Sequence, residues 1–361
     1  MDFSKKIIDW YFQHKRNLPW RKTKDAFKIW VSEVILQQTR VEQGLTYYKA
    51  FVKKFPDVYS LAAANENDVL KLWQGLGYYT RARNMMAGAR QIVEQYNGIV
   101  PNTFEQIIKI KGIGSYSASA ILSFAFNKPY PVMDGNVKRV LARYFNIGTD
   151  IKSKATENLI FRKLERLFDK KNPADFNQAI MEFGALQCKI NNPECTQCVL
   201  KSSCKAFIKN RVSKIPYTLK KTELKTRFFY YLVPLFKFKN EKFTYLEKRQ
   251  DDDIWRHLYQ FPLIESEKKL NIKDLIKSTA YKKLMNDNQA EIVPSMSTYL
   301  HKLSHQIIEA AFLQVNISKE LPDENYIKVK LVDLKKYPVS RLTEKYLNQN
   351  LNLKTNFKKI F

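Results

Sequence analysis

The stretch IIKIKGIGSYSASAILSFAFNKPYPVMDGNVKRV, residues 107–140, carries the most informative pattern in this chain of 361 residues. An apolar helical segment ends at Gly112, Ile113 and Gly114, and a second helix rich in small residues follows to about Phe126. Because glycine adopts positive φ angles at little cost, two glycines around one apolar residue predict a tight hairpin between the helices. The free amides at the start of the second helix can bind a phosphate, although an ordinary helix turn is the alternative interpretation.

A single acidic residue follows this hairpin. Pro129 and Pro131 end the second helix, and the run Met133–Asn136 places Asp134 just ahead of a third, basic helix. Such an arrangement delivers one carboxylate to a DNA strand, just beyond a phosphate-binding element. The combination resembles the helix-hairpin-helix, Gly/Pro…Asp superfamily of DNA glycosylases, although Lys111 replaces the proline that this superfamily usually carries before the first glycine.

The composition is that of a globular protein with a polyanionic partner. Hydrophobic residues make up 45% of the sequence, and 62 basic residues against 35 acidic ones give a net charge of +27. Because an excess of this size repels itself in a compact fold, we expect a nucleic acid as partner, with a generally basic surface as the alternative. The sequence has no apolar run of membrane-spanning length and no N-terminal signal core, so we expect no membrane partner and a cytoplasmic location in a bacterium.

Helical periodicity dominates the first part of the chain, and strand periodicity dominates the last. Apolar residues recur at spacings of three and four in the segments 1–20 (ended by Pro19), 26–38, 43–55, 65–76, 81–96, 153–169 and 175–187. β-branched and aromatic residues fill 228–238, 243–249, 258–265, 307–317 and 326–334, with helical patterns at 271–285 and 340–351. We therefore predict a multi-domain protein with an all-α domain over 1–207, a basic linker over 208–227 and an α+β domain over 228–361.

All four cysteines fall in one short loop, CKINNPECTQCVLKSSC, with the spacing C-x6-C-x2-C-x5-C. A disulfide framework would spread its cysteines along the chain, whereas four thiolates in one loop can surround one metal centre. Zinc and iron–sulfur clusters both use four thiolates. The spacing is similar to the cluster loop of the endonuclease III and adenine glycosylase families, and this resemblance implies a [4Fe–4S] cluster held by Cys188, Cys195, Cys198 and Cys204.

Glu33 stands out in the segment LPWRKTKDAFKIWVSEVILQQTRVEQ, residues 18–43. Its neighbours Val31, Val34 and Ile35 are apolar, and a carboxyl among apolar groups has a raised pKa, which suits a general acid. A glutamate on a helix surface is the alternative. However, SEVILQQTRV resembles the SE-x-x-LQQT signature of the MutY family of adenine DNA glycosylases, in which this glutamate protonates the adenine.

Three further positions bear on the same resemblance. In GLGYYTRARN, residues 75–84, the family counterpart of Tyr78 wedges into the duplex beside the oxidised base. Bifunctional lyase relatives place a lysine two residues after the hairpin, and Tyr116 at that position implies a monofunctional enzyme. The segment HKLSHQ, residues 301–306, resembles the family's F-S-H loop with Leu303 in place of the phenylalanine, and its domain resembles a Nudix fold without the catalytic Nudix box.

The resemblance implies a helix-hairpin-helix glycosylase domain, with a six-helix barrel over about 22–130 and a cluster part over 1–21 and 131–207, joined to a Nudix-like recognition domain. It implies that a monomer excises adenine opposite 8-oxoguanine or guanine in double-stranded DNA. Its implied catalytic residues are Glu33 as general acid at adenine N7, Asp134 as stabiliser of the sugar cation, and Asn136 and Tyr116 as groups that hold Asp134 and the sugar. The implied substrate and DNA contacts are Arg16, Trp20, Arg21, Leu36, Gln38, Thr39, Tyr78, Gly112, Gly114, Ser304 and His305, with a monovalent cation at the hairpin carbonyls.

Two other functions stay open at this point. One is an endonuclease III-like glycosylase and lyase for damaged pyrimidines, against which Tyr116 and the extra C-terminal domain argue. The other is a non-catalytic, cluster-bearing DNA-binding protein, against which the pair Glu33 and Asp134 argues.

Overall fold

The computed structural model of the chain describes residues 3–219, 224–285, 290–321 and 325–351. Its contacts divide the chain into two compact units. We call Met1–Ala63 with Asn84–Lys221 the helical unit, and Ala64–Arg83 with Thr222–Phe361 the sheet unit. The predicted combination of an all-α part with an α+β, Nudix-like part is confirmed. None of the described helices is both long enough and apolar enough to cross a membrane.

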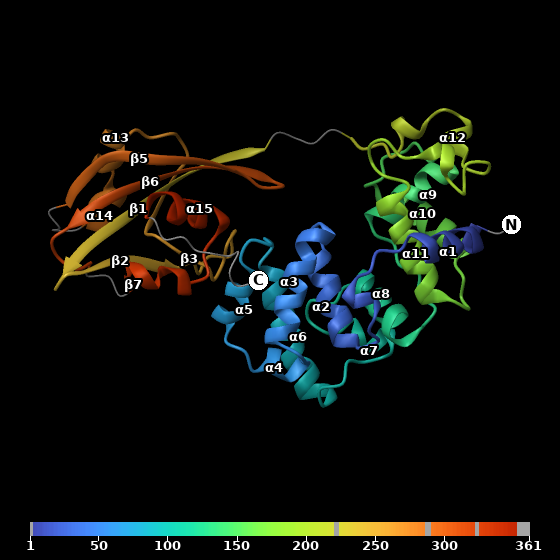
Figure 1. The fold of residues 1–361 in the computed structure, drawn as a ribbon. Helices are drawn as coiled ribbons and strands as arrows, with labels where there is room; N and C mark the ends of the chain where they lie inside the picture. The colour runs from blue at the N-terminus through green and yellow to red at the C-terminus, as the bar shows by residue number, and fades with distance from the viewer. Residues whose placement is uncertain (1–2, 220–223, 286–289, 322–324, 352–361) are drawn as a thin grey trace. The chain divides into compact units, whose positions relative to one another are not determined.

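The helical unit consists of helices in two groups (Figure 1). One group contains α2 (Ala26–Leu36), α3 (Val41–Lys54), α4 (Val58–Ala62), most of α6 (Thr80–Tyr96), α7 (Phe104–Ile107) and α8 (Ser115–Phe126). The other contains α1 (Phe3–His14), α9 (Gly135–Phe145), α10 (Lys154–Leu167), α11 (Pro173–Leu186) and α12 (Lys205–Ile208). Short 3-10 turns lie at η1 (Pro19–Arg21), η2 (Cys195–Gln197) and η3 (Val212–Lys214).

The prediction of one helix over residues 1–20 is wrong. Helix α1 ends at His14, and Pro19 begins the separate turn η1 instead of ending α1. Proline has no amide hydrogen to lose and a fixed φ angle, so it fits the first position of a helical turn. The non-helical residues between α1 and η1 separate Trp20 and Arg21 from α1 and place them on a short turn.

Local signals fix the helix ends that matter for the site. The Asp25 carboxylate accepts hydrogen bonds from the amides of Phe27 (3.0 Å) and Lys28 (3.2 Å) and so caps the start of α2. In the hairpin, Gly112 has a φ of 85°, a conformation that glycine adopts without strain. Helix α8 then begins at Ser115, as the hairpin motif predicts.

Each group of helices has an apolar interior. Trp30 of α2, Phe51 of α3 and Ile121 of α8 are fully buried in the first group. In the second group, buried side chains of α1, α9, α10 and α11 form one cluster, in which the partly buried Cys188, Cys198 and Cys204 also pack. Helices α9 and α11 cross closely, because a Cβ atom on Gly184 would lie 2.6 Å from the Cβ atom of Asn136. This close crossing fixes the start of α9 against α11.

The sheet unit is built on a seven-stranded mixed sheet with the main order β3-β2-β1-β6-β5. Strand β1 (Lys225–Phe238) runs parallel to β6 (Gln306–Ile317) and antiparallel to β2 (Glu241–Lys248) and β4 (Leu263–Ser266). The remaining strands are β3 (Tyr259–Gln260), β5 (Ala290–Lys302) and β7 (Tyr326–Lys330). The long strand β5 is absent from the sequence prediction.

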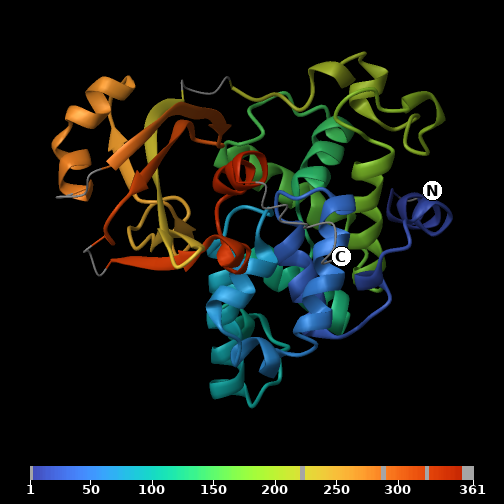
Figure 2. The same cartoon turned by 60° about the vertical axis from the view of Figure 1, so that its left-hand side comes forward.

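Helices cover both faces of this sheet (Figure 2). The helix α15 (Arg341–Asn350), preceded by the 3-10 turn η4 (Leu331–Lys336), packs on the face that carries Phe229 and Tyr231. The helices α13 (Ile272–Lys277) and α14 (Thr279–Met285) pack on the face that carries Tyr230 and Leu232. The alternation of successive β1 side chains between two cores follows from the two-residue repeat of a strand.

The segment 64–83, which includes α5 (Glu66–Trp73), groups by its contacts with the sheet unit, whereas the sequence analysis assigned it to the helical domain. Glu66 pairs with Lys248 at 3.2 Å and with His257 at 2.9 Å. Backbone groups are also used, since Lys71 Nζ donates to the Tyr337 carbonyl at 3.0 Å. These bonds join residues that are far apart in the sequence, which is why a local pattern does not reveal them.

Candidate active site

One pocket of the helical unit, with a volume of about 990 Å³, brings most of the predicted site together. It is lined by the four predicted catalytic residues Glu33, Tyr116, Asp134 and Asn136. Six of the predicted substrate and DNA contacts also line it: Arg16, Trp20, Arg21, Leu36, Gln38 and Thr39. Separate stretches of the chain therefore meet here: residues 16–21 with the turn η1, the C-terminal half of α2 with the turn that follows it, the starts of α8 and α9, and α11.

Glu33 lies on α2 and is buried, with 6% of its surface exposed. Burial raises the pKa of its carboxyl to about 7, because the charged form loses its hydration. A hydrogen bond from Tyr116 and the positive charge of Arg21 oppose this rise, and the charge of Asp134 adds to it. A carboxyl with this pKa is partly protonated at neutral pH, so it can donate a proton.

Asp134 occupies the cap position at the start of α9. One of its carboxylate oxygens accepts from the Val137 amide at 2.7 Å, and the other accepts from the Asn136 side chain at 2.8 Å. Burial raises the pKa of Asp134 above its usual value, and these two hydrogen bonds act in the opposite direction by stabilising the ionised form. The carboxylate is thus held in one orientation by the helix that follows it.

A buried arginine extends this network toward the cysteine loop. Arg139 donates to the Asn136 side-chain oxygen at 2.8 Å, to the Gly184 carbonyl at 2.7 Å and to the Cys188 carbonyl at 2.9 Å. Asp134, Asn136 and the first residue of the cysteine loop are therefore connected through one guanidinium. Because Arg139 lies three residues after Asn136 on α9, both side chains share a face of the helix.

Several polar residues of the pocket wall were not predicted from the sequence, among them Arg139, Gln178 and Glu182. The last two lie four residues apart on α11, so both face the same side of that helix. Polar residues at this spacing on the largely apolar second half of α11 are the signal that was available in the sequence.

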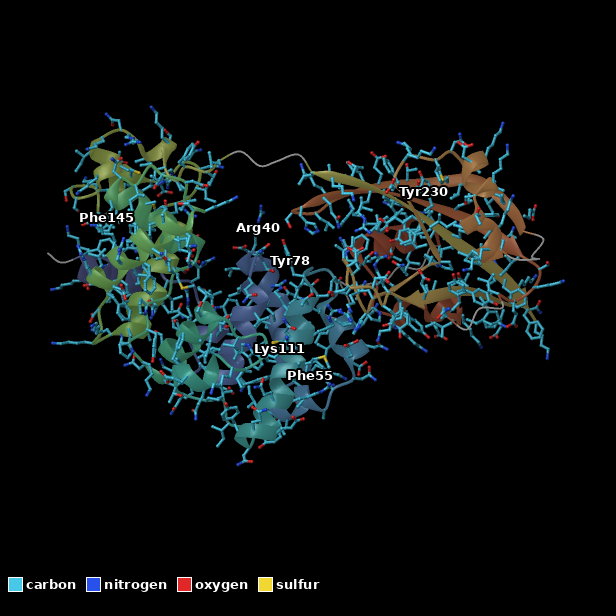
Figure 3. All side chains as sticks on the ribbon, turned by 180° about the vertical axis from the view of Figure 1, so that it is seen from behind. Arg40, Phe55, Tyr78, Lys111, Phe145 and Tyr230 are labelled. Atoms are coloured by element: carbon cyan, nitrogen blue, oxygen red, sulfur yellow. The ribbon has the colours of Figure 1, made fainter. Side chains whose placement is uncertain are left out.

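The turn after α2 carries Gln38 and Thr39 at the rim of the pocket. Gln38 is exposed and has a φ of 56°, a conformation that residues other than glycine rarely adopt. The next residue, Arg40, is also exposed where α3 begins (Figure 3). This turn therefore presents polar and basic groups to the solvent in a fixed, uncommon backbone shape.

The hairpin glycines are also part of the helical unit. A Cβ atom on Gly112 would lie 3.0 Å from the Cβ atom of Asn84, so the hairpin packs tightly against α6. Gly114 is exposed and has open space beside it. The amides at the start of α8 are thus accessible on the side where a phosphate would approach.

Three predicted contacts to the oxidised strand, Tyr78, Ser304 and His305, lie in the sheet unit. Tyr78 is half-exposed, has a φ of 49°, and donates from its hydroxyl to Ser304 Oγ at 3.2 Å (Figure 3). His305, the next residue after Ser304, is exposed. Tyr78 and Ser304 are therefore neighbours within one unit, although 226 positions separate them in the sequence.

The four cysteines surround one small apolar cavity of the helical unit. All four are free thiols, and burial raises the pKa of Cys198 to about 11. Arg143 donates to Cys188 Sγ at 3.4 Å, which brings a positive charge to the thiol group. Among the residues that the structure describes, no three His, Cys, Asp or Glu side chains are close enough to hold a single metal ion.

Comparisons with known proteins agree with this geometry. Residues 31–167 match the HhH-GPD superfamily base excision DNA repair protein model, and residues 235–349 match the NUDIX domain model. An adenine DNA glycosylase of Buchnera aphidicola subsp. Baizongia pistaciae is 38% identical over 84% of this chain and 83% of the relative. The chain belongs to the adenine DNA glycosylase family. The predicted resemblance to this family is therefore confirmed.

Another member of the family and two solved structures match a smaller share of this chain. The human adenine DNA glycosylase is 42% identical, over 56% of this chain and 39% of that protein. A thermostable thymine-DNA glycosylase structure aligns with a TM-score of 0.53 and 26% identity over 57% of this chain and 95% of that one. A trapped endonuclease III–DNA covalent intermediate shares the fold, with a TM-score of 0.50 and 21% identity over 57% of this chain and 94% of that one.

We predict that the Glu33 carboxyl titrates with a midpoint near pH 7 in the folded protein. The Tyr116 hydroxyl favours the ionised form, so Tyr116→Phe should move the midpoint to higher pH. Carbon-13 NMR of labelled glutamate side chains measures both, and Glu33→Gln identifies the signal by its disappearance. A Glu33 midpoint near the ordinary value of 4.5 would contradict the argument from burial.

Proposed function

We propose that this protein hydrolyses the N-glycosidic bond of adenine paired with 8-oxoguanine or guanine in double-stranded DNA. The observation that carries the proposal is the buried Glu33 with a pKa near 7, in the same pocket as the helix-capping Asp134. One group is suited to give a proton and the other to remain an anion, which is the pairing that acid-assisted loss of a base requires.

In the proposed reaction, Glu33 donates its proton to adenine N7. The bond between sugar C1′ and adenine N9 then breaks, and its electron pair leaves with the base. The sugar is left as an oxocarbenium cation, which the Asp134 carboxylate stabilises by its charge or captures covalently. Water adds to C1′ and gives a proton to the Glu33 carboxylate, which restores both Glu33 and the charge of the site. The target base has to leave the duplex to reach Glu33, as in other base-flipping enzymes.

The proposed reaction ends with removal of the base. A lyase step would use a lysine amine to form a Schiff base with the sugar. Tyr116 stands where lyase relatives carry that lysine, and its hydroxyl hydrogen-bonds to Glu33. A phenol cannot form a Schiff base, which supports a monofunctional enzyme.

The preference for 8-oxoguanine belongs to the same proposal and concerns the sheet unit. 8-Oxoguanine carries a proton on N7, whereas guanine does not. A serine hydroxyl can accept that proton in a hydrogen bond. The neighbouring hydroxyls of Ser304 and Tyr78, 3.2 Å apart and both exposed, support a shared role in reading this edge.

We also propose that Cys188, Cys195, Cys198 and Cys204 hold a [4Fe–4S] cluster. The shared cavity and the four free thiols support this proposal, together with the cysteine spacing that resembles the family's cluster loop. When bound, the cluster would tie the four thiolates together and so fix the shape of the loop. The loop in turn positions the Cys188 carbonyl, which accepts the hydrogen bond from Arg139.

The proposed activity is tested with duplexes that contain A:8-oxoguanine, A:G or thymine glycol:A. We expect strand cleavage only after alkali, and only with the A:8-oxoguanine and A:G duplexes. Glu33→Gln should bind the same DNA but lose about 10²–10⁴-fold in single-turnover excision, because neutral adenine is a poor leaving group. Release of thymine glycol, or near wild-type excision by Glu33→Gln, would refute the proposal.

Lesion reading is tested with the double variant Ser304→Ala, His305→Ala. One hydrogen bond to a base edge contributes about 1–3 kcal/mol of discrimination, so the preference for A:8-oxoguanine over A:G should fall without loss of A:G excision. Single-turnover rates and binding on both duplexes measure this, with Ser297→Ala on β5 as a matched control. An unchanged preference would contradict a role of Ser304 and His305 in lesion recognition and would assign it to Gln38, Thr39 and Tyr78.

The cluster is tested by its iron content. Anaerobically purified protein should be brown and contain about four irons per chain, as a [4Fe–4S] centre requires. Cys198→Ser should lower the iron content and weaken DNA binding, because the basic loop loses the cluster that fixes its shape. Elemental analysis and DNA titration measure these, and stoichiometric zinc without iron would show that this part of the proposal is wrong.

A further inference from the structure

We propose that Glu182 is a positioning residue that fixes Arg16 and Arg21 on the wall of the pocket and balances their charge beside Glu33. The inference rests on the proposed function, since it concerns how the general acid is kept available. Glu182 does not need to touch the substrate for this role, because it acts through the two arginines.

Arg16 and Arg21 both bind the Glu182 carboxylate, and we call these three residues the clamp. Arg21 donates from both terminal nitrogens, at 2.8 Å to Oε1 and 2.8 Å to Oε2. Arg16 donates from its terminal nitrogen to Oε2 at 2.6 Å, and from Nε and its backbone amide to Oε1 at 3.0 and 2.8 Å. Bidentate pairs of this kind fix orientation as well as charge. The carboxylate is almost completely buried, with 1% of the side chain exposed.

Other contacts hold the Arg21 head in the same orientation. Its Nε donates to Gln178 Oε1 at 3.1 Å, and its terminal nitrogen also donates to the Arg16 carbonyl at 3.1 Å. Its guanidinium lies 5.5 Å from the centre of the Tyr11 ring. The turn η1, which also carries the pocket residue Trp20, is therefore pinned to α11 mainly through Glu182.

The charges around this clamp decide its effect on the acid. Glu33 faces Tyr116 from α8, Asp134 at the start of α9, and Arg21 from η1. Glu182 stays ionised at any working pH, because its arginine partners lower its pKa to about 2. The remaining groups facing the clamp are Tyr11 and Asp175, and Glu42, which lies 3.9 Å from Arg16.

The loss of Glu182 would leave Arg21 with an uncompensated positive charge next to Glu33. A positive charge favours the ionised form of a neighbouring carboxyl. Glu33 would then lose its proton at lower pH, and less of the protein would carry a proton to donate. A residue with a merely structural role would change stability without changing the pH at which Glu33 titrates.

The experiment compares Glu182→Gln with the wild-type protein. This change keeps the shape of the side chain and removes its charge. We expect the NMR midpoint of Glu33 to fall by about one pH unit. The single-turnover excision rate above neutral pH should fall about tenfold, since the protonated fraction drops tenfold per unit. The control is Glu157→Gln, which removes a partly exposed pair with Lys138 at 2.7 Å and should leave the midpoint unchanged.

A second variant tests the same inference if Glu182→Gln does not fold. Arg21→Gln removes the positive charge itself, so the Glu33 midpoint should rise. An unchanged midpoint in folded Glu182→Gln, or in Arg21→Gln, would overturn the inference. The NMR readout is independent of activity, so a wild-type protein that fails to excise adenine would refute the proposed function and leave this result interpretable.

Discussion

The hydrogen bond from the Val137 amide to the Asp134 carboxylate is the constraint on which the pocket depends. It joins a side chain to the first turn of a helix, so the carboxylate cannot turn away without breaking the cap of α9. The close crossing of α9 and α11 at Gly184 holds that helix end in turn. An anion fixed in advance stabilises a developing positive charge without having to reorganise.

The pKa of the second carboxyl of the pocket, Glu33, is set mainly by burial. Glu33 lies on a helix whose other faces are buried in the apolar interior, and loss of hydration is the main cause of its raised pKa. Asp134 accepts two hydrogen bonds that favour its ionised form, whereas Glu33 accepts one, from Tyr116. Burial raises the pKa of both acids, but the groups that oppose this rise differ between the two carboxyls. Burying a carboxyl in this way costs folding free energy, which is a common property of functional sites.

Sequence patterns predicted the parts of the site that depend on nearby residues. The start of α8 follows from the glycine pair before it, and the cap of α9 follows from Asp134 itself. The pairing of Glu182 with Arg16 and Arg21 joins residues more than 150 positions apart, and no local pattern encodes it. Strand β5 was missed for a related reason: it lies at the end of the sheet order, and its mix of polar residues with Pro294 lacks the apolar repeat of a central strand.

The grouping of residues 64–83 with the C-terminal half has a consequence for how the protein is made and divided. The sheet unit consists of two stretches of chain, and the helical unit contributes the stretch between them. During synthesis, α5 leaves the ribosome before its partners are synthesised. These partners are Lys248, His257 and Tyr337. No single cut of the backbone separates the two units. A fragment that begins at residue 224 would lack α5, so its binding surface for that helix would be bare.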